Sequence, residues 1–194
     1  MSTEISARKS ELRQQLRAKL KSLAAGDCAE SSLRACELLR AQMIWKNAGA
    51  ILFYAPLPDE VDLSPLLDEA LAAKKIVALP RFLVATKTYA AVQIKSWKDD
   101  GAPGKFGIHE PSENCPVIPL NHLDLVLAPG VGFDSIGHRL GRGQGFYDRL
   151  LAQVSGIKCG IAFDEQMVQE IPAEPHDVRL NCILTPTRWL QITS

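Results

Sequence analysis

The sequence has 194 residues, which is enough for one sizeable hydrophobic core. Hydrophobic residues make up 46% and charged residues 23%, a composition typical of soluble globular proteins and outside the disordered and fibrous classes. The 22 basic residues balance the 22 acidic ones, so no overall field favours nucleic acid or an anionic membrane. We expect one domain over residues 1–194, present as a monomer, with any anion site confined to a local cluster.

Cysteine usage and the lengths of the apolar runs bear on the compartment. The five cysteines form no C-x-x-C pair and no spacing typical of metal sites, which favours reduced thiols. The longest apolar runs fall short of the roughly 18 to 20 residues that a membrane span needs. The first residues also lack the apolar stretch and cleavage site of a secretory signal. We therefore expect a cytoplasmic protein with no membrane partner.

Apolar periodicity predicts alternating helices and strands. The first helix is indicated by leucines at steps of four, four and three: Leu12, Leu16, Leu20 and Leu23. Short apolar runs bounded by glycine or proline predict buried strands, and a stretch rich in glycine and proline predicts a long ordered loop. The expected elements are helices at 6–23, 29–47, 64–75 and 146–154, strands at 48–56, 76–82, 88–94, 124–129, 158–163 and 181–186, and the loop at 96–119. This order predicts an α/β fold with a mostly parallel sheet flanked by helices on both faces.

Residues 138–150, HRLGRGQGFYDRL, follow a predicted strand and lead into a predicted helix. In open α/β sheets such a connection lies at the carboxyl ends of the strands, where ligands bind. Gly141, Gly143 and Gly145 allow the backbone to curl several N–H groups around one anion. Arg139 and Arg142 supply planar donor groups suited to phosphate oxygens. The pattern indicates a phosphate cradle, although it is neither a Walker A loop nor a dinucleotide fingerprint. The alternative is a hairpin with solvated arginines.

Two aspartates are candidates for a metal site near this cradle. Asp148 lies in the first turn of the predicted helix, where a carboxylate is favoured by the helix dipole whether or not it does chemistry. Asp177 lies in a proline-bounded loop just before the strand at 181–186 and is otherwise an ordinary loop residue. Because Mg²⁺ usually takes one or two carboxylates plus phosphate oxygens, both residues are candidates to hold it.

Two cations continue the apolar stripe of the first helix. Lys9 and Arg13 lie on the same helical face as Leu16 and Leu20. Since the leucines dock on the protein body, the cations either extend past its edge into water or point at an anionic group.

Five motifs, in one order along the chain, carry a resemblance to a known family. They are KSELR at 9–13, PLPDEVD at 56–62, KFGIHEP at 105–111, APGVGFDSIGHRLGRGQGFYDRLL at 128–151 and HDVRL at 176–180. Together they resemble the 5-formyltetrahydrofolate cyclo-ligases, also called 5,10-methenyltetrahydrofolate synthetases. The resemblance implies a fold similar to that of sugar-phosphate isomerases and CoA-transferases. It also implies a reaction in which ATP, with Mg²⁺, drives ring closure of 5-formyltetrahydrofolate to 5,10-methenyltetrahydrofolate, ADP and phosphate.

The resemblance also implies roles for individual residues. It assigns Arg142 and Lys9 to catalysis, Asp148 and Asp177 to Mg²⁺, and Glu60 to the folate, whose amino and ring N–H donors suit a carboxylate. Without the resemblance, Glu60 is an ordinary loop acid and Phe146 and Tyr147 are core aromatics. The implied ATP contacts are Lys9, Ser10, Glu11, Leu12, Arg13, Arg139, Leu140, Gly141, Arg142, Gly143, Gln144, Gly145, Phe146 and Tyr147. The implied contacts to the folate, with or without a polyglutamate tail, are Ala55, Glu60, Arg142, Gly143, Gln144, Gly145 and Phe146.

Two departures from the family pattern and two rival functions complete the expectations. Gln144 and Phe146 stand where the family often has glycine and tyrosine, which removes one hydroxyl but leaves the cradle intact. One rival is a paralogue of the same fold that uses ATP on another substrate in cofactor salvage. The other is a folate- or nucleotide-binding module without turnover. Glu60 and the two aspartates speak against both. A nucleic-acid binder is the least favoured function, because the net charge is zero and no stripe of basic and aromatic residues is present.

Overall fold

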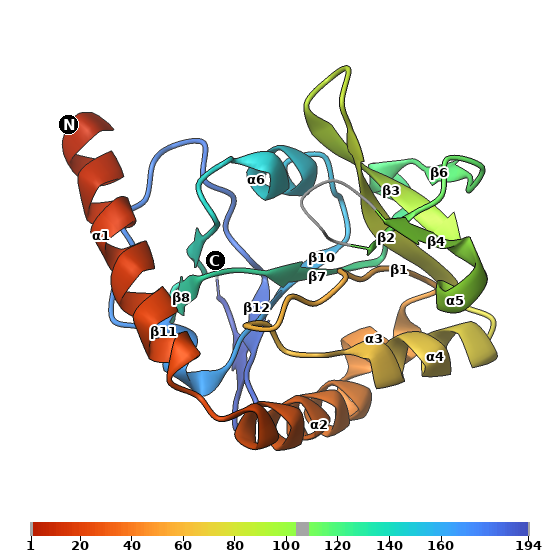
Figure 1. The fold of residues 1–194 in the computed structure, drawn as a ribbon, viewed down its shortest axis with the longest axis horizontal. Coiled ribbons are helices and arrows are strands. Elements are labelled where there is room, and N and C mark those ends of the chain that lie inside the picture. The colour runs from red at the N-terminus through yellow and green to blue at the C-terminus, as the bar shows by residue number, and fades with distance from the viewer. Residues whose placement is uncertain (1, 104–108, 194) are drawn as a thin grey trace.

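The computed structural model describes residues 2–103 and 109–193. Figure 1 shows a central β-sheet with helices on both faces and the long helix α1 standing along one side. In chain order the helices are α1 (Ser2–Lys21), α2 (Ala25–Ala41), α3 (Met43–Asn47), α4 (Ser64–Ala72), α5 (Trp97–Asp100), η2 (Leu120–His122), α6 (Phe146–Leu151) and η3 (Asp164–Gln166). The strands are β1 (Ala50–Leu52), β2 (Ile76–Leu83), β3 (Thr88–Ile94), β4 (Gly101–Pro103), β5 (His109–Pro111), β6 (Val117–Ile118), β7 (Leu125–Pro129), β8 (Gly132–Asp134), β9 (Arg139–Leu140), β10 (Ile157–Ile161), β11 (Met167–Val168), β12 (Cys182–Leu184) and β13 (Trp189–Gln191).

The main sheet has eight strands in the order β13-β12-β10-β7-β1-β2-β3-β6. Its five central strands, β12, β10, β7, β1 and β2, pair in parallel, whereas β13 and the β3–β6 pair add antiparallel strands at the two edges. Two smaller sheets, β11-β8-β9 and β4-β5, complete the set within the described residues. The predicted α/β fold with a mostly parallel sheet is confirmed.

The central strands β1, β7 and β12 are apolar and buried throughout because both faces of the sheet are covered. On β7, Leu125 and Leu127 pack into one core cluster together with side chains of α2, α3 and α4. The alternate residues Val126 and Ala128 pack into a second cluster, which includes the buried leucines of α6. The two-residue period of the strand thus divides one apolar run between two cores.

Helix α1 docks through the leucine stripe that its sequence predicts. Leu16 is buried against Val131, Leu140 and Ile171, which places the helix on the small sheet that contains β9. Leu20 continues the stripe into the larger core. None of the helices in the described parts of the chain is long and apolar enough to cross a membrane.

Several predicted boundaries are wrong, each for a local reason. The helix predicted at 29–47 is two helices, because Gln42 is extended (ψ 144°) between α2 and α3. No glycine or proline marks this break; the buried Trp45, packed edge-on against Phe53, lies directly after it. The first helix spans 2–21 rather than 6–23, and the helix predicted at 146–154 ends at residue 151.

Short strands account for the other corrections. The segment 96–119 is not a plain loop, since it contains α5, the β4–β5 pair and β6; residues 105–108 of the KFGIHEP motif lie outside the described residues. The glycine-rich connection after β7 contains the β8–β9 hairpin, and β13 follows the strand expected to be last. Elements of two to four residues are too short to produce a hydrophobic period.

The approach of the turn at Gly156 to the start of β7 gives a test of this packing. A methyl group on Gly156 would clash with the carbonyl oxygens of Leu123 and Asp124, the latter at 2.6 Å. We expect Gly156→Ala to lower the free energy of unfolding by about 2 kcal/mol or more, because backbone atoms cannot move aside cheaply. Gly26→Ala is the matched control, since its methyl group would meet no atom within 4 Å. Urea denaturation of both variants checks the prediction, and equal effects would contradict it.

Candidate functional site

A cavity of about 320 Å³ opens beside the residues that follow the central strands β1 and β7. Tyr54 and Ala55 come just after β1, and Pro129 and Gly130 lie at the end of β7. Because parallel strands present their carboxyl ends at one edge, this is the location expected for a ligand in an open α/β sheet. The segment 139–148 contributes most of the remaining wall.

The glycine-rich segment forms a tight turn between β9 and α6. Gly143 and Gly145 have φ values of +103° and +64°, a region that residues with a Cβ rarely adopt. Gly145 is the residue that precedes the first turn of α6. Gly141, Gln144 and Gly145 line the cavity, whereas Gly143 packs against the guanidinium of Arg13. The alternative of a loose hairpin with solvated arginines is wrong, since this turn is built into the cavity wall.

Arg139 anchors the cavity wall from inside the protein. It is 6% exposed, and its Nη2 donates to Oδ1 of Asp148 at 2.8 Å, joining β9 to α6. Nη1 donates to the carbonyl of Pro129 at 3.3 Å, and the guanidinium lies over the ring of Tyr147. Nε is buried with no hydrogen-bond partner among the residues described. A buried donor without a partner is costly, so this N–H group is an unused donor in the cavity wall.

Arg142 and Glu60 meet across the mouth of the cavity. Nη2 of Arg142 donates to Oε1 of Glu60 at 2.9 Å and to Oδ1 of Asp59 at 2.7 Å. The amide of Leu57 donates to the other oxygen of Glu60 at 3.0 Å. Burial raises the pKa of Glu60 above its usual range, although the Leu57 amide and the Arg142 guanidinium both favour the charged form. An additional hydrogen-bond donor at Glu60 would therefore stabilise its charged form.

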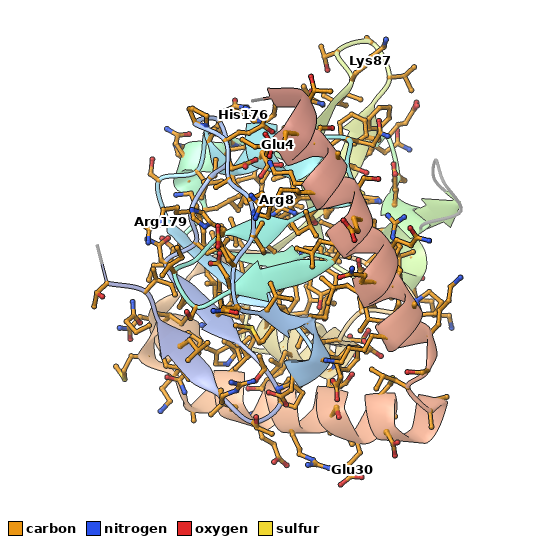
Figure 2. The ribbon with its side chains drawn as sticks, turned by 90° about the vertical axis from the view of Figure 1, so that its left-hand side faces the viewer. Glu4, Arg8, Glu30, Lys87, His176 and Arg179 are labelled. Atoms are coloured by element: carbon orange, nitrogen blue, oxygen red, sulfur yellow. The ribbon has the colours of Figure 1, made fainter. Side chains whose placement is uncertain are left out.

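Lys9 and Arg13 of α1 both point at the protein body. Nζ of Lys9, a residue only 8% exposed, donates to Oδ2 of Asp177 at 2.6 Å and to Oε2 of Glu174 at 3.1 Å. Nε of Arg13 donates to the carbonyl of Gly141 at 2.8 Å, so α1 is hydrogen-bonded to the glycine turn. In Figure 2, His176 lies near the first turns of α1, where Glu4 and Arg8 are labelled, in agreement with the Lys9 contacts. The alternative in which Lys9 extends into water is wrong.

The two candidate metal ligands occupy different surroundings. Asp148 lines the cavity, whereas Asp177 does not line it and is paired with Lys9 of α1. Burial alone would raise the pKa of Asp177, but hydrogen bonds from Lys9 and from the Glu174 amide lower it below its usual value. Burial and the neighbouring Arg17 lower the pKa of Arg13, and the negative charges of Asp177 and Asp148 act in the opposite direction. Among the described residues no group of three or more His, Cys, Asp and Glu side chains could hold a metal ion.

The remaining predicted residues divide between the cavity and its surroundings. Phe146 lines the cavity within an aromatic cluster, with ring centroids 5.1 Å from Phe82 and 5.6 Å from Tyr89. Tyr147 also lines it, and burial raises the pKa of its hydroxyl. Leu140 is buried under α1. Three residues of α1 do not line the cavity. Ser10 and Glu11 are exposed, and Leu12 packs against the small core beneath the helix.

Sequence reasoning missed several residues that the fold brings to the site. Tyr54, Tyr89 and Glu110 line the cavity, and Asp59 and Glu174 hold Arg142 and Lys9. Asp59 is next to the candidate residue Glu60, and Glu174 is three residues before the candidate Asp177 in the same loop. Proximity to a candidate residue was the signal for those two. No local pattern distinguishes Tyr89 on its predicted strand from an ordinary core aromatic.

Comparisons with known proteins point to one family. The model of the 5-formyltetrahydrofolate cyclo-ligase family matches residues 5–186. A 5-formyltetrahydrofolate cyclo-ligase of Mycolicibacterium smegmatis is 36% identical over 74% of this chain and 77% of its own, and one of Mus musculus is 28% identical over 93% and 94%. An NMR structure of Aquifex aeolicus 5,10-methenyltetrahydrofolate synthetase superposes with a TM-score of 0.85 at 31% identity, covering 96% of this chain and 93% of that one. The cavity, its glycine turn and the matching of nearly the whole chain lead to one conclusion: this chain belongs to the 5-formyltetrahydrofolate cyclo-ligase family.

Proposed function

We propose that this cyclo-ligase uses ATP and Mg²⁺ to convert 5-formyltetrahydrofolate to 5,10-methenyltetrahydrofolate, and that the cavity is the place of reaction. The observation that carries the proposal is the pairing of opposite chemistries at one cavity: the buried carboxylate of Glu60 beside the guanidinium groups of Arg139 and Arg142. A carboxylate suits the N–H donors of a pterin, and guanidinium groups suit phosphate oxygens. One site can therefore hold both substrates with their reacting atoms close together.

The reaction balances with these two substrates alone. The formyl oxygen attacks the γ-phosphorus of ATP, and the bond from that phosphorus to the bridging oxygen breaks to release ADP. N10 then attacks the activated formyl carbon and loses its proton, and the carbon–oxygen bond breaks to release phosphate. Because ATP supplies the leaving group, no serine or cysteine nucleophile is required from the protein. The task of the protein is to orient the groups and to stabilise the negative charge that develops.

The folate end of the site is assigned to Glu60 and its surroundings. Glu60 has one oxygen held by the Leu57 amide, so the carboxylate has a defined orientation. Ala55 and Phe146 line the same cavity and provide apolar surface. A flat pterin or adenine ring can pack against the Phe146 face of the aromatic cluster.

The phosphate end is assigned to the glycine turn and its arginines. Gly141, Gln144 and Gly145 bring backbone to the cavity wall, and Arg142 is placed to contact the transferred phosphoryl group. Arg13 supports the turn through the Gly141 carbonyl. Lys9 is held by Asp177 and Glu174, so it reaches a phosphate once Asp177 turns to Mg²⁺. We assign Lys9 and Arg142 to catalysis for these reasons.

Asp148 and Asp177 are the residues proposed to hold Mg²⁺. Both offer hard oxygen donors, and Asp148 lines the cavity with Oδ1 engaged by Arg139. Mg²⁺ in phosphoryl transfer usually takes one or two carboxylates and completes its shell with phosphate oxygens and water. Asp148 offers such a donor at the cavity, and Asp177 would join it after leaving Lys9. When bound, the ion supplies positive charge next to the phosphates.

An absorbance assay of the methenyl product tests the proposal. Protein mixed with 5-formyltetrahydrofolate, Mg²⁺ and ATP should produce the product only when all three are present. Arg142→Ala and Asp148→Asn should each lower kcat/KM by about 10²-fold or more, because charge stabilisation at a phosphoryl group is lost. The melting temperature should change little in Arg142→Ala, whose side chain is partly exposed, and should fall in Asp148→Asn, which leaves the buried Arg139 without its charged partner. Arg8→Ala and Asp68→Asn, at exposed positions, are the matched controls and should retain activity.

The outcomes of this assay separate the candidate functions. Folded protein that binds nucleotide or folate but forms no product would be a binding module without turnover. Hydrolysis of ATP without methenyl product would indicate a paralogue acting on another substrate. Wild-type rates in Arg142→Ala or Asp148→Asn would remove that residue from the mechanism.

The buried charge of Glu60 predicts a trade-off between stability and activity. Its pKa is raised above the ordinary value of 4.5 by burial, so the folded state binds its proton more tightly than the unfolded state does. Stability from this group is therefore present at low pH and is lost as the pH rises through the raised pKa. Glu60→Gln is neutral at every pH, so its stability relative to wild type should increase from pH 4.5 to pH 8 while activity is lost. Urea denaturation across this range measures the difference, and a difference that does not vary with pH would contradict the prediction.

A further inference from the structure

Arg142 contacts the carboxylate that the proposed folate substrate needs. Its guanidinium makes three contacts with two carboxylates: Nη2 to Glu60 Oε1 at 2.9 Å, Nε to the same oxygen at 3.3 Å, and Nη2 to Asp59 Oδ1 at 2.7 Å. The Leu57 amide occupies the second oxygen of Glu60. Both oxygens of the proposed folate ligand are therefore engaged, and the proposed phosphate ligand is engaged with them.

The two sides of this contact differ in freedom. The Glu60 side chain is only 7% exposed and is held by the Leu57 amide, so it is fixed. The Arg142 side chain is 37% exposed and lies between Gly141 and Gly143, in a turn whose backbone conformation depends on glycine. Arg142 is consequently the partner that moves when the contact opens.

Asp59 has a different relation to the site from Glu60. It makes the shortest of the three contacts to Arg142, and its side chain is 31% exposed. It does not line the cavity, and the proposed reaction gives it no substrate contact. Its carboxylate nevertheless sets where the guanidinium rests when no phosphate is present.

We propose that Asp59 is a positioning residue that holds Arg142 against Glu60, and that this contact couples the binding of ATP to the binding of the folate. The inference rests on the proposed assignment of Glu60 to the folate and Arg142 to phosphate. A folate that takes the Glu60 carboxylate releases Arg142 for phosphate. A phosphate that takes Arg142 releases Glu60 for the folate.

The coupling has a quantitative form. Each ligand that binds alone must first open the contact, and its affinity is lowered by the fraction of molecules in which the contact is open. A ligand that binds second finds the contact already open. Each substrate therefore tightens the binding of the other by the same factor, as linkage requires. If the contact is weakened, each ligand binds alone with higher affinity, and the factor by which one ligand tightens the binding of the other becomes smaller.

Calorimetry with 5-formyltetrahydrofolate and a non-hydrolysable ATP analogue with Mg²⁺ measures this factor on the full chain. In the wild type we expect each ligand to lower the Kd of the other by about fivefold or more. Asp59→Asn keeps the shape of the side chain and removes its charge. In this variant both ligands should bind alone severalfold more tightly than to the wild type, and the factor should fall by the same amount. In steady-state assays the KM of each substrate should fall when the other substrate is far below saturation and should stay unchanged when the other is saturating.

Asp68→Asn, an exposed residue on α4, is the matched control for the loss of one negative charge and should behave as wild type. Tighter binding separates the proposed role from a structural one, since damage to the fold would weaken both ligands. Independent binding of the two ligands to the wild type would overturn the coupling and leave the proposed function standing. Unchanged or weaker binding in Asp59→Asn would overturn the role of Asp59. A wild type that binds no nucleotide would overturn the proposed function and the inference together.

Discussion

The arrangement of the site depends on the carboxylate of Asp134, which is completely buried at the end of β8. Oδ1 accepts hydrogen bonds from the amides of Ile136 and His138, which closes the turn that leads into β9. Oδ2 accepts from the Ile171 amide and contacts the His138 ring at 3.0 Å. One buried side chain thus ties the strand that carries Arg139 to the loop that leads to Glu174 and Asp177. Burial of this carboxylate is compensated because three backbone amides donate to its oxygens and the His138 ring contacts one of them.

The basic side chains at and around the site are each paired with acidic ones. Each cation has an acceptor in the ligand-free protein: Asp177 and Glu174 for Lys9, Asp148 for Arg139, and Asp59 and Glu60 for Arg142. A buried cation without a partner is costly, so a site built for polyanions needs such acceptors when it is empty. Under the proposed function the same carboxylates turn to Mg²⁺ or to the folate once phosphate takes the cations. The zero net charge of the chain fits this pairing, since the positive field is local.

The parts of the site that the sequence predicted are those with a local cause. The glycine spacing at 141–145 anticipates the positive φ values, because few other residues adopt them. The position of Lys9 on the leucine stripe anticipates its burial, because the stripe faces the protein. Neither pattern shows which group each cation meets. The Arg13 side chain ends on a backbone carbonyl of Gly141, 128 residues away along the chain, and a carbonyl carries no mark in a sequence.

By itself the sequence determined the order of the main helices and of six strands of the main sheet, the α/β class with a mostly parallel sheet, the glycine turn, and the stripe that directs α1 inward. All of these follow from local periodicity and residue type. The tertiary structure alone decided the break at Gln42, the β8–β9 hairpin and the cavity wall contributed by Tyr89 and Glu110. It also decided that Arg142 rests on Asp59 and Glu60, more than 80 residues away along the chain. Contacts of that range depend on how the sheet brings strand ends together, and no local pattern of residues records this.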